Sequence, residues 1–568
     1  MKYIIGISAF YYESSVALIE NGELKEFLKE ESFTRIKGTS TFPKFCLEYI
    51  KMKYSLNSNN IDACVFYEKP LLSWSRLTYF SMLKPFKRWK INSQQFKAIW
   101  SNGLMFKKYL KNVFNLNSRK IFYSYHHVSH ALTSVAYARY KQNYNSKDKL
   151  IIVADGVGDG ETLSIFKMVK NNLERIYLDL YPNSLGLFYS TITDFLGFNI
   201  NDGEFKVMGL SGYGNPIYKD FILENIISFD NNVKLNMDWF DFDKNPERSY
   251  SNKFLNYFGK QNLNLTSNSS NFQKASNIAS SFQEVLEHIL VQVTEWGIKK
   301  TGINDIYFSG GIAHNSRAMA KIANLNKVKN FTVPPSPGDS GAALGAANYG
   351  NFLINKKFLT KAPLFYSNNF YYPKSNISKN LFKKISKNFD TEKYILNLLV
   401  KGKIICVFNN GAETGPRALG NRSIICSAKL PQIVKKLNSK IKKRESFRPL
   451  SPMILEKNVT KYFYVKSKFN HNLQWMGLTL KSKKLTFKNY KSCVHVDGTS
   501  RVQVINDNQP FYNNILNKLE KLGHEMLINT SFNTAGEPIV FDYIDCYVSM
   551  KKMNIKYLFF DQNLYVKV

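Results

Sequence analysis

Residues 150–160 read Leu150-Ile151-Ile152-Val153-Ala154-Asp155-Gly156-Val157-Gly158-Asp159-Gly160, a buried strand that ends in a polar turn. A hairpin pattern follows over residues 161–177 and is closed by Asn171-Asn172. The same order of strand, polar turn and hairpin occurs in residues 3–28, where Asn21-Gly22 forms the tight turn. Two copies of one pattern predict a duplicated α/β core whose halves face each other across a cleft.

A third strand, residues 305–308, ends in Ser309-Gly310-Gly311 and precedes a helical pattern over residues 315–323. A strand that ends at small residues before a helix leaves amide donors for an anion. Residues 351–387 are rich in aromatic residues, Asn and Ser, as is typical of a linker. A helix over 394–400 and a strand over 404–408 begin a second domain. We therefore expect domains at residues 1–365 and 388–568.

Composition excludes a disordered or fibrous chain. The 568 residues are 44 % hydrophobic, and the formal net charge is +35. This charge suits nucleic acid, an anionic membrane or phosphorylated substrates, but Lys is spread along the whole chain, which favours a solvated basic surface over a dedicated nucleic-acid site. Six separated cysteines and no bilayer-spanning run indicate a soluble cytoplasmic protein. The sequence does not predict an oligomeric state.

One basic segment, residues 74–109, interleaves Trp74, Trp89 and Trp100 with Lys and Arg. Such a segment could lie on an anionic membrane surface as a peripheral contact. A helical insert with its rings packed inward and its lysines in water is the alternative.

Three of the eight histidines fall within residues 126–130. His126 and His130 are four residues apart, which places two imidazoles on one face of a helix at a spacing suited to a metal. His127 could replace His126 as the partner of His130. Acidic ligands are available at Asp155, which ends a buried strand, and at Asp339, which precedes a helix rich in Ala and Gly. Either Asp alone is also ordinary turn or N-cap chemistry.

The predicted second domain carries two runs rich in arginine, Gly415–Ser423 and Lys442–Pro449. One guanidinium group can bind two oxygens of a phosphate or carboxylate at once. Two arginine-rich runs beside Gly and Pro therefore indicate a small polyanionic ligand. The polar clusters His495–Arg501 and Asn529–Asn533 lie on strand-like segments, and their spacing alone assigns them no role.

Together these motifs resemble the O-carbamoyltransferase family of nodulation and aminoglycoside-antibiotic enzymes. The resemblance covers nearly the whole chain. It is carried by Gly6–Tyr11, Glu30–Arg35, His126–His130, Asp155-Gly156, Gly203–Leu210, Gly310-Gly311 with Asn315, Gly338-Asp339, Gly415–Ser423, Arg444–Pro449, His495–Thr499 and Asn529–Pro538.

The resemblance implies an N-terminal domain of the actin-like ATPase superfamily, similar to the tRNA threonylcarbamoyl transferase, and a C-terminal domain similar to the YrdC fold. It implies that carbamoyl phosphate and ATP form carbamoyl adenylate in the C-terminal domain. The N-terminal domain would then transfer the carbamoyl group to a hydroxyl of a sugar or sugar-containing metabolite. A connecting tunnel would keep water from the labile intermediate.

The family's sites map onto this chain as three groups. The ligands of Fe²⁺ would be His126, His130, Asp155 and Asp339. Residues that bind the nucleotide or carbamoyl phosphate would be Gly310, Gly311, Asn315, Arg417, Arg422, Lys442, Arg444, Arg448, Asn529 and Ser531. Catalytic residues would be Tyr12, Glu13, Lys37 and Lys206.

The chain departs from the family where a proton must be removed from the acceptor. Tyr12-Glu13 stands where the family usually has His-Asp, and a phenol is a weak base at neutral pH. Glu13, His127 or metal-bound water would then accept the proton. Of the basic run that the family carries after Thr34-Arg35, this chain keeps only Lys37. His314 stands where an apolar residue is common in the family.

Two other hypotheses are consistent with the sequence. A tRNA threonylcarbamoyl-type enzyme would share both folds and would suit the positive charge. A nucleotide-binding scaffold without catalytic activity would explain Tyr12. The arginine motifs and the intact metal and anion residues favour the carbamoyltransferase.

Overall fold

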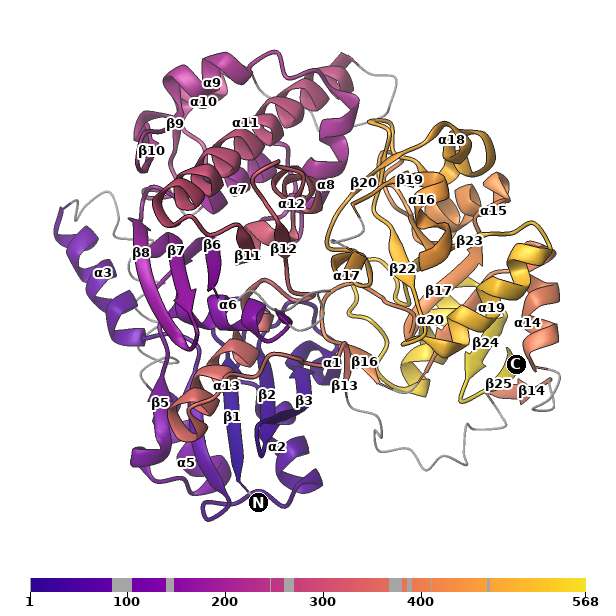
Figure 1. The fold of residues 1–568 in the computed structure, drawn as a ribbon, viewed down its shortest axis with the longest axis horizontal. Coiled ribbons are helices and arrows are strands. Elements are labelled where there is room, and N and C mark those ends of the chain that lie inside the picture. Colours follow the sequence, from indigo (N-terminus) through magenta and orange to yellow (C-terminus); the bar gives the residue numbers. More distant parts are fainter. Residues whose placement is uncertain are drawn as a thin grey trace. The chain divides into compact units, whose positions relative to one another are not determined.

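The computed structural model describes residues 2–83, 105–138, 148–245, 247–259, 270–366, 381–385, 391–409, 411–466 and 470–568. These residues form two compact units (Figure 1). Unit 1 contains residues 1–30 and 39–362, and unit 2 contains residues 31–38 and 363–568. The centre of the basic aromatic segment, residues 84–104, lies outside the described residues.

Unit 1 contains two five-stranded sheets with the same strand order. The first is β3-β2-β1-β4-β5 and the second is β8-β7-β6-β11-β12. In each sheet the first three strands pair antiparallel and the last two continue in parallel. The bounds are β1 (Tyr3–Ser8), β2 (Ser15–Glu20), β3 (Glu23–Lys29), β4 (Ile61–Phe66), β5 (Ile121–Tyr123), β6 (Asp148–Gly158), β7 (Glu161–Val169), β8 (Asn172–Leu180), β11 (Asp305–Ser309) and β12 (Asn330–Thr332).

Local sequence explains the hairpins of these sheets. Asn21 and Gly22 both have positive φ, 49° and 85°, as the tight turn between β2 and β3 requires. Strand β6 is longer than the strand expected at residues 150–154, and its pairing with β7 shifts register between Ala154 and Gly158. An irregular strand end re-aims side chains, and here it carries Asp155.

Helix α13 (Asp339–Asn355) packs between the first sheet and helix α6 (His126–Val135). Two glycines permit this close packing. A Cβ on Gly6 of β1 would lie 2.0 Å from the carbonyl oxygen of Ala343, and a Cβ on Gly345 would lie 1.6 Å from that of Ser129. The Ala- and Gly-rich sequence of α13 therefore brings its first residue, Asp339, to the helix that carries the histidines.

Unit 2 is built on an eight-stranded mixed sheet of order β14-β25-β24-β15-β17-β23-β18-β22. Helices α14 (Thr391–Val400) and α19 (Pro510–Lys521) contribute to its apolar core, which includes Ile395, Leu516 and Leu527. The bounds are β14 (Phe382–Lys384), β15 (Ile405–Phe408), β17 (Arg422–Ser427), β18 (Ser451–Leu455), β22 (Gln503–Ile505), β23 (Met526–Ser531), β24 (Tyr557–Phe560) and β25 (Asn563–Lys567).

Residues 31–38 belong to unit 2 although they lie early in the chain. Arg35 forms an ion pair with Asp545 at 3.2 Å, and its guanidinium donates to the carbonyl oxygens of Pro538 and Ile539. The rings of Phe33 and Phe541 pack with centroids 4.9 Å apart. An insertion from the N-terminal sequence thus completes the C-terminal unit.

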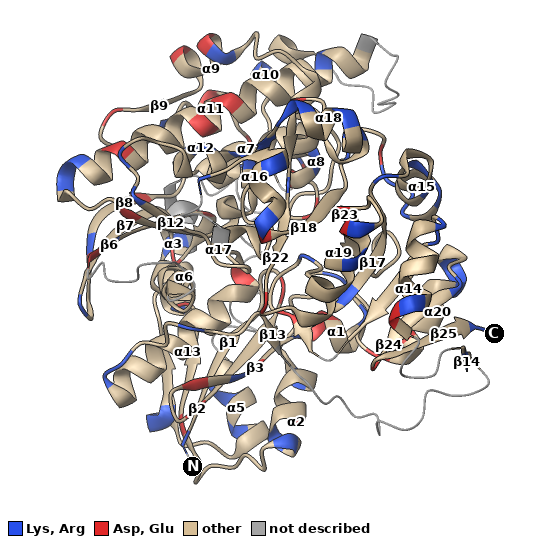
Figure 2. Cartoon of the chain, turned by 45° about the vertical axis from the view of Figure 1, so that its right-hand side comes forward, with Lys and Arg blue, Asp and Glu red and all other residues tan. Residues whose placement is uncertain are grey.

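The expected mixed α/β class is confirmed. The expected linker is only partly correct, because α13 continues through the apolar residues Phe352 and Ile354 to Asn355, and β13 (Phe365–Tyr366) and β14 lie within the interval 351–387. Lys and Arg are spread over helices of both units (Figure 2). Among the described residues, no helix is long and apolar enough to cross a membrane.

Candidate metal centre and cationic site

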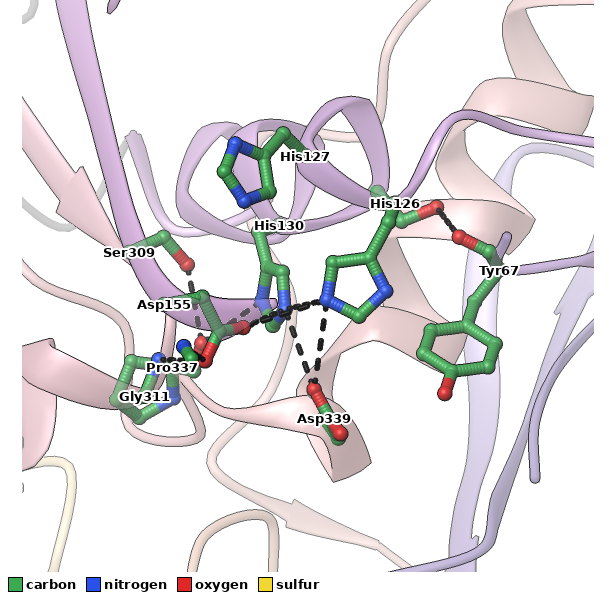
Figure 3. Close-up of polar contacts among 12 residues, drawn as sticks. Tyr67, His126, His127, His130, Asp155, Ser309, Gly311, Pro337 and Asp339 are labelled. Carbon is green, nitrogen blue, oxygen red and sulfur yellow. Dashed lines mark hydrogen bonds and ion pairs between the residues drawn. The ribbon is translucent and has the colours of Figure 1, made fainter. Parts of the chain in front are cut away.

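Four predicted ligands converge in unit 1. One ligand atom from each of His126, His130, Asp155 and Asp339 lies within 4.8 Å of the other three (Figure 3). Nε2 of His130 lies 2.9 Å from Asp155 Oδ2 and 3.4 Å from Asp339 Oδ1. Nε2 of His126 lies 3.3 Å and 3.6 Å from the same two oxygens. The site is thus assembled from α6, the end of β6 and the first residue of α13.

Neighbouring groups fix the orientation of these ligands. Nδ1 of His130 donates to the carbonyl oxygen of Pro337 at 3.0 Å, which orients Nε2 toward the cluster. Asp155 Oδ1 accepts the amide protons of Gly156 and Gly311, at 2.7 Å and 3.3 Å, so Oδ2 faces the histidines. The turn that contains Gly311 was expected to bind an anion, and one of its amides binds Asp155.

Two buried acids that sequence reasoning did not single out lie behind His126. Asp159 Oδ2 accepts the His126 amide and Oδ1 accepts the Lys69 amide, both at 2.8 Å. Glu68 Oε2 lies 3.9 Å from His126 Nδ1. Burial, followed by the nearby Asp159 and Asp339, raises the pKa of Glu68 well above its ordinary value. Both acids adjoin apolar strand or turn residues, a pattern too common to identify them from sequence.

The electrostatics of the cluster favour a cation. Burial opposes protonation of His130, but hydrogen bonds to Asp155 and Asp339 outweigh it and raise the pKa of His130 to about 10. Burial also opposes ionisation of Asp155, yet hydrogen bonds from both histidines hold the pKa of Asp155 well below its usual range. The two nitrogen and two carboxylate donors, without thiolate, suit Fe²⁺ and chemically similar divalent ions.

His127 does not belong to the cluster. Its ring points away from His130 (Figure 3), and its Nδ1 forms a 2.7 Å hydrogen bond with Ser164. His127 is fully buried. The structure therefore brings His126, and not His127, together with His130 in the four-ligand cluster.

The other predicted residues of unit 1 have distinct environments. Glu13 Oε2 accepts a 2.7 Å hydrogen bond from Ser340, the residue after Asp339, and lies 3.9 Å from Lys29 Nζ. Tyr12 precedes Glu13 in the same loop and is half-buried. Lys206 lies on α8 (Glu204–Leu210), outside the four-ligand cluster, with Nζ 5.3 Å from the ring centroid of Phe198.

Two predicted nucleotide-binding residues have structural partners. Gly310 has φ 90°, and a Cβ on Gly310 would lie only 2.2 Å from the carbonyl oxygen of Ala154, so a larger residue would clash there. Asn315 caps α12 (Ser316–Ala323) through the amide of Ala318 and pairs with the Gln283 amide in both directions. His314 lies beside Gly338, the residue before Asp339, because a Cβ on Gly338 would be 2.9 Å from the His314 Nε2.

Unit 2 contains a cluster of cations. The pKa of Arg501 lies well below its ordinary value. Burial is the largest cause, and the positive charges of Arg417, Arg444 and Arg448 add to it. Burial, followed by Arg448, lowers the pKa of Arg444 to about 9. Like charges that depress one another's pKa are energetically unfavourable until an anion joins them. Arg501 was in a polar segment to which the sequence assigned no role, and only the fold places it among the other arginines.

Lysines also contribute to this electrostatic environment. Burial, followed by Arg444 and Arg448, lowers the pKa of Lys442, and Lys37 adds to the effect. Lys442 Nζ donates to the carbonyl oxygens of Ser531 and Asn533, at 2.9 Å and 2.6 Å. Lys442 therefore anchors the end of β23.

The remaining predicted residues of unit 2 differ from this cluster. Arg422 is buried, donates to the carbonyl oxygen of Asn409 and lies with Cζ 3.6 Å from the ring centroid of Phe408. Asn529 donates to the Ala418 carbonyl at 2.9 Å and to Gln503 at 2.6 Å, which fixes the arginine-bearing loop to the sheet.

Comparisons with known proteins agree over both units. The model for the carbamoyltransferase N-terminus matches residues 3–348, and that for the carbamoyltransferase C-terminus matches residues 396–567. An uncharacterized protein of Synechocystis sp. is 30 % identical, with 98 % of this chain and 95 % of the relative aligned. Nodulation protein NolNO of Sinorhizobium fredii is 26 % identical, with 94 % of this chain and 76 % of NolNO aligned.

Among solved structures, an activator of 2-hydroxyisocaproyl-CoA dehydratase from Clostridium difficile is 13 % identical and has a TM-score of 0.32. The aligned part covers 62 % of this chain and 96 % of that structure.

Proposed function

The chain belongs to the carbamoyltransferase family and is a carbamoyltransferase, and from this premise we propose the reaction that it catalyses. Carbamoyl phosphate and ATP form carbamoyl adenylate in unit 2, and the carbamoyl group is then transferred in unit 1 to a hydroxyl of a sugar or sugar-containing metabolite. The observation that carries the proposal is the convergence of His126, His130, Asp155 and Asp339 on one point.

The proposed reaction has three steps. Water cleaves carbamoyl phosphate to carbamate and phosphate. A carbamate oxygen attacks the α-phosphorus of ATP, and the bond to pyrophosphate breaks. The acceptor oxygen then attacks the carbamoyl carbon, the bond to AMP breaks, and the hydroxyl proton passes to a base.

The cation cluster of unit 2 suits the second step. The charges of Arg417, Arg444 and Arg448 help to lower the pKa of Arg501, and that of Arg448 helps to lower the pKa of Arg444, so a triphosphate would relieve this repulsion. Guanidinium groups would hold the pyrophosphate as it leaves and neutralise its charge. Arg444 and Arg501 are the residues on which the proposal depends most, because both have strongly lowered pKa values.

In unit 1, His126, His130, Asp155 and Asp339 would hold an Fe²⁺ ion. When bound, the ion would supply Lewis-acid stabilisation of charge on the carbamoyl oxygen. The protein's own contribution is to orient the ligands through Pro337 and Gly311. We also propose that unit 1 is related to the actin-like ATPase superfamily and that unit 2 is related to the YrdC fold.

Glu13 is the proton acceptor that we propose for the hydroxyl. Its carboxylate contacts Ser340 and therefore lies one residue from the ligand Asp339. A carboxylate can accept the proton of a hydroxyl whose acidity rises as the new bond forms. Tyr12 would shape the same loop.

Pyrophosphate release tests the first part of this proposal. Protein incubated with ATP and labelled carbamoyl phosphate should release pyrophosphate only when both are present. Equal release without carbamoyl phosphate would contradict the proposal. Addition of fractionated small metabolites and glycans, followed by mass spectrometry, should reveal a product heavier by one carbamoyl group. Glu13→Gln should abolish that product and leave pyrophosphate release within twofold.

A further inference from the structure

The two histidines of the metal cluster are supported unequally. Nδ1 of His130 has the carbonyl oxygen of Pro337 as an acceptor at 3.0 Å. The His126 side chain is also buried, yet its Nδ1 has no hydrogen-bond partner within the part of the chain that the structure describes. A buried polar atom without a partner is costly, so the surroundings of this nitrogen need an explanation.

The His126 ring has little room to turn toward another acceptor. A Cβ on Gly158 would lie 2.1 Å from Cγ of the ring, so the backbone of β6 packs directly against it. The ring of Tyr67 lies beside it as well, with the two centroids 5.1 Å apart (Figure 3). Its Nε2 faces Asp155 and Asp339. The fold therefore sets the direction of Nδ1, and an acceptor has to come to this atom.

Glu68 lies within reach of this nitrogen. Its Oε2 is 3.9 Å from Nδ1 of His126, and the Glu68 side chain is buried. The nearby Asp159 is already engaged, because its two carboxylate oxygens accept the amide protons of Lys69 and His126. A hydrogen bond from a ring nitrogen to an oxygen has a length of about 2.9 Å, so the Glu68 carboxylate needs to move by about 1 Å.

The backbone on both sides of Glu68 is fixed, so this movement is confined to its side chain. The carbonyl oxygen of Tyr67 accepts a 2.9 Å hydrogen bond from Ser129 Oγ of α6. The amide of Lys69 donates to Asp159, which directly follows β6. Both neighbours of Glu68 are thus tied to elements that carry or adjoin the metal ligands.

The charges around Glu68 favour a contact with a polarised N–H group. Burial, Asp159 and Asp339 raise the pKa of Glu68, and Arg76 of α3 (Pro70–Leu83) lowers it. The two acids thus leave an excess of negative charge beside the carboxylate. An imidazole proton becomes a stronger donor when the other ring nitrogen binds a divalent ion, and such a proton would offset this excess.

We propose that Glu68 is a positioning residue for the metal centre: its carboxylate accepts the Nδ1 proton of His126 and thereby fixes Nε2 as the metal-binding atom of that ring. Loss of such an acceptor typically lowers metal affinity by about 10- to 100-fold. His130 uses a neutral carbonyl for the same task, so the charged acceptor makes His126 the stronger donor. The inference rests on the metal site of the proposed function.

Titration of the full chain with Co²⁺ tests the inference. Co²⁺ is stable in air, suits the same donors as Fe²⁺ and absorbs visible light. Glu68→Gln keeps an acceptor without the charge and should bind Co²⁺ about tenfold more weakly than the wild type. Glu68→Leu removes the acceptor and should bind it about 100-fold more weakly. The absorption maximum of bound Co²⁺ should also differ between Glu68→Gln and the wild type, because the donor strength of His126 changes.

Melting temperatures separate this role from a structural one. Neither Glu68 variant should melt below the wild type in the absence of metal, because each removes a buried acid that has acidic neighbours. The matched control is Glu161→Gln, since Glu161 is a buried acid that lies 3.7 Å from Nδ1 of His127, outside the cluster. This variant should melt at a lower temperature, because Arg175 loses its ion pair, and should keep its Co²⁺ affinity within twofold.

The possible failures can be told apart. Equal Co²⁺ affinity in Glu68→Leu and the wild type would overturn the inference and leave the metal site in place. Equal weakening in Glu68→Leu and Glu161→Gln would also overturn it, because the effect would then be general. If the wild type bound neither Co²⁺ nor Fe²⁺, the proposed metal site would fail and the inference with it. Pyrophosphate release should stay within twofold in every variant and reports on unit 2 separately.

Discussion

The Nε2 atoms of His126 and His130 lie 3.0 Å apart. Because His130 donates through Nδ1 to Pro337, its Nε2 is the ring atom that faces the neighbouring imidazole nitrogen. Two such nitrogens, faced by the carboxylates of Asp155 and Asp339, are stable together only with a proton or a metal ion near them. The geometry of these histidines thus indicates a cation site without reference to any relative.

Replacement of one ligand should separate the two half-reactions. His130→Ala should lower iron bound after anaerobic loading by at least tenfold and abolish carbamoyl transfer, because it removes a nitrogen donor. Pyrophosphate release in unit 2 should remain within twofold. His127→Ala is the control, since that ring points away from the cluster and should leave bound iron unchanged. Equal loss of both half-reactions would contradict the separate roles of the two units.

The packing of α13 on α6 should control the same site from a distance. In Gly345→Ala the new Cβ would meet the Ser129 carbonyl oxygen at 1.6 Å, so the helices must separate. We expect a loss of about 3 kcal/mol in the free energy of unfolding and a reduced iron content. Gly156→Ala, whose Cβ would meet no atom within 4 Å, should change stability by less than about 0.5 kcal/mol. Urea denaturation measures both, and equal effects would show that the helix contact is not limiting.

The sequence predicted those parts of the site that depend on local periodicity. His126 and His130 were identifiable because helical spacing brings residues four apart together, and Asp155 because a buried strand ends there. Local patterns could not show that Arg501 joins Arg417 and Arg444, because that contact depends on how separate strands pair in unit 2. Residues 31–38 were assigned to the N-terminal domain for the same reason.

Arg35 should stabilise unit 2 although it lies in the N-terminal sequence. Arg35→Ala would remove an ion pair with Asp545 and leave the carbonyl oxygens of Pro538 and Ile539 without their charged donor. We expect a loss of about 2 kcal/mol in the free energy of unfolding. Lys552→Ala removes a more exposed ion pair with Glu537 and should cost less than about 0.5 kcal/mol. A stability change in Arg35→Ala no larger than in this control would show that residues 31–38 do not support unit 2.

Removal of one cluster arginine should have opposite effects on stability and function. In Arg501→Ala, loss of repulsion from Arg417, Arg444 and Arg448 should raise the melting temperature of the ligand-free protein by a few degrees. The KM for ATP in pyrophosphate release should increase at least tenfold. Arg119→Ala, an exposed arginine of unit 1, should change neither. A lower melting temperature together with an unchanged KM would indicate that Arg501 has only a structural role.

Binding of a polyanion to unit 2 should take up protons. Burial and the cations Arg444 and Arg448 lower the pKa of Lys442 well below its ordinary value, so the free protein holds that proton weakly. Pyrophosphate would favour the charged ammonium and raise its pKa, and affinity should therefore fall as pH rises between the two pKa values. Calorimetry in two buffers of different ionisation enthalpy measures the uptake. Lys442→Arg, which keeps its charge, should bind with less uptake and a flatter pH dependence, whereas proton release by the wild type would contradict the expected coupling.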